Sequence, residues 1–591
     1  MERQNNLTQP SLEQQITVSG DEVSQIKAIA AAVHEHGYKA VVQCLDDCYR
    51  KEKYDYLSCL SHIPDNELSR EISFQIIWIF REYISICGRQ AVKVVFDVAE
   101  KCHRLAGQDA AGGVALEMIE TYLHRYPEDI HEAITHCERK DPYNNGSQFV
   151  WRAALGHNVK ANIGKFLSWL DNAKTDEEIA IAMHTLTFVP EKISDVSTVA
   201  NEVTDRIVKM HGLCLNDTAK GELYRAGEAW RKVVDGRHGR ILEEIACKLL
   251  GEGNPTVLYW ATQEAAFSVK QQSEKDVDAF LVAFSKIDPI HKGSIENLSF
   301  YLQKLLNVCP GKVFAFIETY CRDHSCNVTI FNGLIHAIAN CDETFRNRYL
   351  TRWLSSDSMS DAGNVHEIVS GVRPGKTLMI RAVFDSCEEC TDEILLFLFL
   401  RAIGWLYLMP ETCVGFLVSC ACQMRKIECL KSIYGDFFYL VILNYLDEYK
   451  QTLDKIPACD RRTAVFKYLK KLELEGERWW KRLKDAGELP ELSPSIRHKE
   501  LHAKRQKEVY GKAMEEVQKN SLLSQIAHNV FLLHGRGSIT PVYTAEGESL
   551  QESLLQHFSA SVRIPMLSEI EGHTLAIRLL ELRRVRREEC T

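Results

Sequence analysis

The sequence predicts a mostly α-helical protein, an irregular α-solenoid of antiparallel helical hairpins followed by a small α+β C-terminal module. Three observations support this prediction. Apolar residues recur at helical spacing, helix-capping patterns precede several of these stretches, and short loops separate helices of three to four turns. With 591 residues, 45% of them hydrophobic, the chain can form several domain-sized units.

The first helices are expected to begin at capping boxes. Ser19-Gly20-Asp21-Glu22 precedes apolar residues at helical spacing that run to Gly37, where we expect this helix to end. Thr175-Asp176-Glu177-Glu178 precedes a second helix, which Pro190 closes. In such a box the first side chain accepts a hydrogen bond from an otherwise unpaired amide of the first turn. We expect residues 1–260 to form an N-terminal helical domain.

The clearest hairpin pattern lies inside the expected central helical-repeat domain, residues 261–460. Five helices are predicted there, with the bounds Ser273–Ile287, Ser294–Val308, Lys312–Asp323, Val328–Asn340 and Asp342–Leu354. The first and third start 39 residues apart, and the second and fourth start 34 residues apart. This spacing is close to the period of HEAT and TPR repeats. Because no consensus recurs at fixed offsets, an irregular helical bundle is the alternative architecture.

The most apolar stretch of the chain runs from Glu393 to Tyr449. Its segments Ile394–Met409, Val414–Cys422 and Phe437–Leu446 are predicted to be central helices that are buried on all sides, with Leu396, Phe399, Leu443 and Leu446 in the core. Ile394–Met409 is shorter than the roughly 18 residues that cross a bilayer, and Arg401 lies within it. We therefore expect a core helix and no membrane partner.

The N-terminus and the cysteines favour a cytoplasmic protein. Met1–Asn6 lacks the basic and apolar pattern of a secretory signal. The 20 cysteines are spread along the chain, many of them on apolar helix faces, which is typical of reduced, buried thiols. The net charge of -10 is modest for this length and does not by itself indicate a nucleic-acid or membrane-surface protein.

Residues 461–591 are expected to form a basic helical linker and the small α+β module. Between 461 and 520, sixteen basic residues outnumber ten acidic ones, which leaves a net charge of about +6. Leu489–Pro494 is a linker-like break, and 538–544 and 559–564 alternate as strands do. The last predicted helix, 576–587, is rich in arginine.

This basic region is the candidate nucleic-acid interface. Arg478-Trp479-Trp480-Lys481-Arg482 interleaves cations with aromatic rings, which suits phosphate neutralisation and base stacking. The candidate residues are Arg478, Trp480, Lys481, Arg482, Lys504, Arg505 and Lys507. In the alternative interpretation the tryptophans anchor the helix in the core and the charges form a solvated face, because glutamates are interspersed among them.

A weaker candidate is a structural zinc site. Cys387 and Cys390 have the C-x₂-C spacing that brings two thiolates to one ion, and Cys420 and Cys422 follow about thirty residues later. Two residues 2 apart on a helix point in nearly opposite directions, which favours core thiols as the alternative. Cys321–Cys326 is a still weaker ligand cluster. No cofactor is expected.

No local motif predicts catalysis. Gly371–Thr377 resembles a phosphate-binding loop only in part, because its first glycine lies one residue too close to the Gly-Lys-Thr. The favoured function is a non-catalytic helical-repeat scaffold or adaptor that binds protein partners within a larger cytoplasmic assembly. The alternatives are nucleic-acid association through the basic region after 461, and an enzyme whose site is assembled from residues distant in sequence.

Overall fold

The fold is mostly helical, as the sequence predicts. The computed structural model describes residues 12–13, 21–68, 70–107, 111–188, 199–234, 236–371, 377–384, 390–457, 460–486, 495–501, 503–504, 507–508, 511, 537–544, 547–554 and 572–590. Contacts divide the chain into two compact units, unit 1 (Met1–Leu305) and unit 2 (Leu306–Thr591). The domain boundaries expected at 260 and 460 stay predictions.

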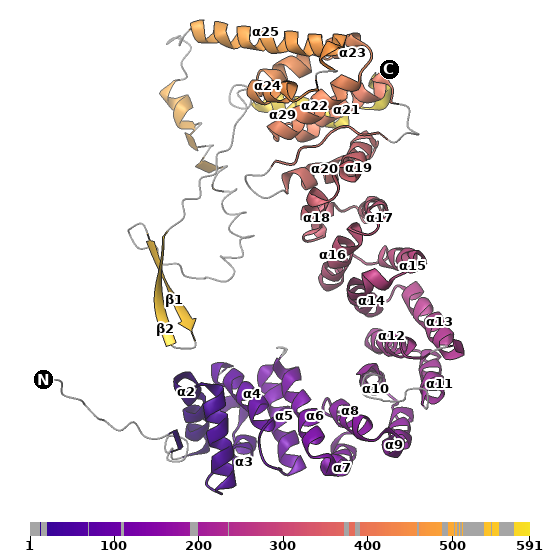
Figure 1. Cartoon of the computed structure of the whole chain (residues 1–591), viewed down its shortest axis with the longest axis vertical. Helices are drawn as coiled ribbons and strands as arrows, with labels where there is room; N and C mark the ends of the chain where they lie inside the picture. Colours follow the sequence, from indigo (N-terminus) through magenta and orange to yellow (C-terminus); the bar gives the residue numbers. More distant parts are fainter. Residues whose placement is uncertain are drawn as a thin grey trace, which may run out of the picture. The chain divides into compact units, whose positions relative to one another are not determined.

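The described residues of unit 1 form a series of α-helices joined by short loops and 3-10 turns (Figure 1). The helices that begin in it are α2 (Glu22–Arg50), α3 (Tyr56–His62), α4 (Arg70–Ile84), α5 (Val92–Ala106), α6 (Ala111–Arg125), α7 (Ile130–Lys140), α8 (Ser147–His157), α9 (Val159–Asp171), α10 (Asp176–Phe188), α11 (Ala200–His211), α12 (Asp217–Arg231), α13 (Gly236–Glu252), α14 (Pro255–Ser268), α15 (Glu274–Phe284) and α16 (Lys292–Leu306). Each helix from α4 to α12 with an even number packs against the next even-numbered one. In Figure 1, α10, α12 and α14 therefore lie on one side of this array, with α11, α13 and α15 on the other.

Polar contacts between helices of unit 1 recur at a spacing of 40 residues. The Tyr49 hydroxyl donates to the Arg89 carbonyl (3.2 Å), and the Arg89 Nε donates to Asp129 Oδ1 (3.0 Å). Lys140 Nζ donates to Glu100 Oε2 at 2.6 Å. Each of these contacts joins residues 40 positions apart. Two helices with their loops occupy about this length, so each contact joins residues about two helices apart.

The two capping boxes have different outcomes. Thr175 caps α10 as expected, because the Glu178 amide donates to Thr175 Oγ1 (3.2 Å) and the Thr175 amide donates to Glu178 Oε2 (3.0 Å). Asp21 is the residue that caps α2, through a 2.6 Å bond from the Ser24 amide. The predicted break at Gly37 is confirmed, because this residue has a non-helical conformation and separates two helical segments within α2. Gly37 has φ +77°, which a glycine adopts without strain, and a second helical segment follows it and runs to Arg50, the last residue of α2.

The described residues of unit 2 form further helices and one pair of strands. Its elements are α17 (Pro310–Asp323), α18 (Leu334–Asn340), α19 (Glu343–Ser355), α20 (Met359–Ser370), α21 (Asp392–Leu406), α22 (Pro410–Gln423), α23 (Ile427–Ser432), the π-helix η7 (Gly435–Ile442), α24 (Leu446–Asp454), α25 (Ala464–Ala486), β1 (Gly537–Thr544), β2 (Gly547–Leu554) and α29 (Gly572–Arg584). Of the five helices predicted between Ser273 and Leu354, four are confirmed as α15, α16, α17 and α19. The prediction of one helix over Val328–Asn340 is wrong, because left-handed Gly333 separates a 3-10 turn from α18.

The apolar centre of unit 2 is built around α21. Side chains all round this helix are buried, and Phe399 packs edge-on against Phe437 with ring centres 4.8 Å apart. Phe399 and Leu443 are buried as predicted, whereas Leu396 and Leu446 are only half-buried. Leu446 begins α24 instead of ending a helix, because the preceding segment is the π-helix η7. Among the described helices, none has the length and apolarity needed to cross a membrane.

The strands and the last helix follow α25. β1 overlaps the expected strand 538–544 and pairs antiparallel with β2, from Gly537 opposite Leu554 to Thr544 opposite Gly547. The expected linker 489–494 and strand 559–564 lie outside the described residues. Helix α29 packs against α21, where Gly404 lets the two backbones approach closely.

Candidate functional site

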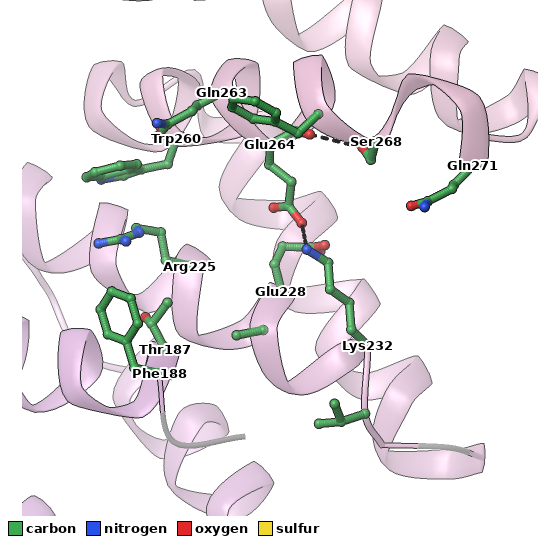
Figure 2. A pocket seen from close by; sticks show the side chains of 13 residues that line it. Thr187, Phe188, Arg225, Glu228, Lys232, Trp260, Gln263, Glu264, Ser268 and Gln271 are labelled. Carbon is green, nitrogen blue, oxygen red and sulfur yellow. Dashed lines mark hydrogen bonds and ion pairs between the residues drawn. The ribbon is translucent and has the colours of Figure 1, made fainter. Parts of the chain in front are cut away.

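A groove of about 560 Å³ lies over α10, α12 and α14 in unit 1 (Figure 2). Helix α12 packs against both α10 and α14, so side chains from all three helices line one surface. The residues that line the groove are Thr187, Phe188, Arg225, Glu228, Ala229, Lys232, Val233, Trp260, Gln263, Glu264, Phe267, Ser268 and Gln271. We refer to this site as the α10–α14 groove.

Arg225 lies between two aromatic rings in the groove (Figure 2). Its guanidinium carbon is 3.9 Å from the centre of the Trp260 ring and 5.7 Å from that of Phe188. Its Nη1 donates to Glu222 Oε2 at 2.9 Å and lies 3.0 Å from His184 Nδ1. Cation–π contacts of this kind contribute about 0.5–2 kcal/mol. Because the side chain is already held in place, little of its freedom remains to be lost when a ligand binds.

The edge of the groove carries exposed aromatic rings. Phe267 is 74% exposed, and Phe300 on α16 is 44% exposed. Lys304 Nζ lies 4.2 Å from the centre of the Phe300 ring and 5.1 Å from that of Phe267, and it donates to the Ala266 carbonyl at 2.8 Å. Exposed aromatic side chains beside a concave surface are typical of protein interaction sites.

Two glutamates in the groove form ion pairs. Glu264 pairs with Lys232, and Glu228 accepts from Arg231 through Nε (3.0 Å) and Nη2 (2.7 Å). Burial raises the pKa of Glu228 although the hydrogen bond from Arg231 acts in the opposite direction, and the nearby charge of Glu264 adds to the rise. The ion pair with Arg231 therefore does not fully offset the unfavourable effect of burial on the charged form of Glu228.

The groove is part of a longer series of cations and rings, which we call the cation–aromatic row. It runs over α8, α10, α12, α14 and α16, and its members are Arg152, Phe188, Arg225, Trp260, Phe267, Phe300 and Lys304. Arg152 stacks on Phe188 at 4.7 Å. These residues were not identified from the sequence, because they lie on five different helices and form no motif of neighbouring residues in the sequence. The available signal was spacing, since Arg152, Phe188 and Arg225 are 36 and 37 residues apart.

The predicted nucleic-acid residues fall mainly on α25. Arg478, Lys481 and Arg482 are exposed on its C-terminal half, and within the described part of the chain they have no ion-pair partner. Trp480 is half-buried and its indole N–H donates to the Leu443 carbonyl at 3.0 Å. Trp480 therefore anchors α25.

Two other members of the predicted nucleic-acid set are described. Lys504 and Lys507 are exposed, whereas Arg505 lies outside the described residues. A single surface that joins these lysines to α25 stays a prediction.

The arginines of the C-terminal helix α29 and of the residues after it form hydrogen bonds and ion pairs with other parts of unit 2. Arg578 forms a two-bond pair with Asp436 (2.8 and 2.7 Å), and Arg583 donates to the Gly404 carbonyl at 2.7 Å. Arg587 donates to the Ser355 carbonyl. These contacts hold α29 and the residues after it on the helices of unit 2.

The cysteines proposed as zinc ligands are only partly described. Cys420 is fully buried in α22, and burial raises its pKa well above the ordinary value, which favours the thiol over the thiolate that binds metal. Cys390 and Cys422 are half-buried, and Cys387 lies outside the described residues. Within the described ranges, no group of three or more His, Cys, Asp or Glu side chains has the geometry to hold a metal ion. The zinc site stays a prediction.

The chain matches no known protein-family model, and a search of curated proteins finds no match to its sequence.

Proposed function

We propose that the chain is a non-catalytic scaffold with a HEAT- or TPR-like solenoid architecture, and that it binds protein partners through the α10–α14 groove. One observation supports this most directly. A 74% exposed phenylalanine, Phe267, lies beside the ordered Arg225–Trp260 stack in a groove of about 560 Å³. Tryptophan and arginine are the residues that most often carry binding energy at protein interfaces.

The length of the cation–aromatic row favours a macromolecular partner over a small ligand. The row crosses five helices whose axes, at ordinary packing distances of 8–10 Å, place its ends on the order of 35 Å apart. A helix or an extended segment of a partner protein has this length, and stacked hairpins offer such extended surfaces.

The recurring 40-residue contacts support the repeat architecture, because each hairpin meets its neighbour through comparable positions. In this proposal the chain acts in the cytoplasm as one subunit of a larger assembly. The β1–β2 pair would belong to the small α+β module after residue 461.

A peptide selection tests the proposed function. A library of random dodecapeptides displayed on phage is selected against the full chain, and the enriched peptides are titrated against Phe267→Ser and Ile290→Ser variants. Ile290, 76% exposed, is the matched control, because its replacement removes an equally exposed apolar side chain outside the groove. We expect Phe267→Ser alone to weaken binding at least tenfold, as at an interface hot spot. Equal binding by both variants, or no enriched peptide, would contradict the proposal.

The second candidate function is sequence-independent nucleic-acid binding by α25. The exposed and unpaired state of Arg478, Lys481 and Arg482 within the described residues favours it. Single- and double-stranded oligonucleotides are titrated at two salt concentrations, with Arg478→Glu/Arg482→Glu compared against Arg237→Glu/Arg240→Glu on α13. Loss of affinity and a flatter salt slope in the first double variant alone would support α25. No binding by the wild type at low salt would exclude this function.

A further inference from the structure

We propose that a second hollow, between α12, α13, α14 and α15, binds a cationic side chain, lysine or arginine, of the protein partner. This hollow has a volume of about 270 Å³, and we call it the α12–α15 hollow. It shares Glu228, Lys232 and Glu264 with the α10–α14 groove, so a partner in the groove lies next to it. The inference rests on the proposed function and specifies the chemistry of the partner.

The strongest evidence is the hydroxyl group of Tyr224, which lines the hollow. Tyr224 is only 1% exposed, and its hydroxyl has no hydrogen-bond partner among the residues that the structure describes. A buried hydroxyl without a partner is unfavourable, because it has lost its hydrogen bonds to water and gained none in the protein. A ligand with N–H donors in the hollow would remove this deficit, because a phenol oxygen accepts hydrogen bonds.

The charges around the hollow select a cation. Four carboxylate side chains line it, those of Glu228, Glu243, Glu264 and Asp276, but only two cationic ones, those of Arg231 and Lys232. An incoming ammonium or guanidinium group would balance this excess of negative charge, whereas an anion would increase it.

The walls of the hollow suit the aliphatic part of such a side chain. Leu250 from α13 and Ala279 and Phe280 from α15 contribute apolar surface next to the carboxylates. Lysine and arginine pack their methylene groups on apolar surface while the charged end reaches polar groups. The hollow thus offers both kinds of contact to one side chain.

Saturation-transfer NMR on the full chain tests this inference with n-butylammonium, n-butylguanidinium and the neutral analogue n-pentanol as probes. We expect transfer from the wild type to at least one cation and not to n-pentanol. Tyr224→Phe removes the hydroxyl without changing any charge, and we expect it to reduce the transfer at least fivefold. Tyr83→Phe is the matched control, because the buried Tyr83 hydroxyl also lacks a partner among the described residues but does not line the hollow.

The outcomes separate this inference from the proposed function. Equal transfer in Tyr224→Phe and the wild type, transfer to n-pentanol as strong as to the cations, or no transfer to either cation would overturn the inference. A cation that binds in a Tyr224-dependent way, together with no peptide sensitive to Phe267→Ser, would support the hollow and contradict the groove as a protein-binding site.

Discussion

At the scale of single residues, Tyr122 and Tyr224 show how differently two buried hydroxyl groups are used. The Tyr122 hydroxyl donates to the Gln90 carbonyl (2.6 Å) and accepts from the Gln90 amide (3.0 Å), whereas the Tyr224 hydroxyl has no partner within the described residues. We expect Tyr122→Phe to lower the free energy of unfolding by about 1–3 kcal/mol, because it removes two hydrogen bonds, and Tyr224→Phe to raise it by up to about 1–3 kcal/mol, because it removes a buried hydroxyl that has no partner. Urea unfolding of both variants measures this difference. A loss of stability in Tyr224→Phe would mean that its hydroxyl is already satisfied.

The raised pKa of Glu228 predicts that the stability of unit 1 depends on pH. Burial raises its pKa above the ordinary value of 4.5, so near neutrality the folded protein holds this proton more strongly than the unfolded chain does. The resulting stabilisation is present below pH 4.5 and is lost as the pH rises through the raised pKa. We therefore expect the stability of the wild type, relative to Glu228→Gln, to fall as the pH rises above 4.5. A stability difference that stays constant over this range, in urea titrations, would contradict the raised pKa.

Residue-level prediction succeeded where the contact is local in sequence. The Thr175–Glu178 box spans three residues, and both of its hydrogen bonds form. Arg225 and Trp260 are 35 positions apart, so their stack depends on how α12 packs against α14. Neither residue stands out from its own neighbours in the sequence.

At the scale of elements, the contact between α21 and α29 depends on a glycine. A Cβ atom on Gly404 would lie 2.6 Å from the Arg583 amide nitrogen, which is a backbone atom that can move only with α29. We expect Gly404→Ala to weaken the docking of α29 by about 1–3 kcal/mol and to speed hydrogen exchange in residues 572–590. Gly363→Ala is the control, because its Cβ would make an ordinary 3.7 Å contact with Trp405. Slow exchange in both variants would show that α29 is held without this close approach.

Helix prediction failed at some of the places where backbone geometry departs from the regular α-helix. The break at Gly37 was predicted correctly, whereas left-handed Gly333, which separates a 3-10 turn from α18, was not predicted. The π-helix η7 displaced the predicted boundary at Leu446. Apolar periodicity carries no information about these choices, because a kinked helix and two separate helices have the same pattern of buried positions.

At the scale of the whole molecule, the spacing of apolar residues predicted the mostly helical fold, but no sequence pattern predicted the candidate groove. The basic and cysteine clusters are conspicuous because their members are adjacent in sequence, whereas the groove collects residues from α10, α12 and α14. Such a site can be found in the sequence only by comparing residues that are about 36 positions apart. The spacing of 36 to 37 residues among Arg152, Phe188 and Arg225 is the trace that it leaves in the sequence.

The central claim, that a protein partner binds the α10–α14 groove, is tested most directly by photo-crosslinking in cells. A benzophenone-bearing amino acid replaces Phe267 in one variant and Ile290 in another, two positions with 74% and 76% exposure in unit 1. We expect a discrete crosslinked protein adduct from position 267, suppressed by a Trp260→Ala change that removes the ring under Arg225, and no such adduct from position 290. Equal adducts from both positions, or an adduct from position 267 that the Trp260→Ala change leaves intact, would contradict the claim.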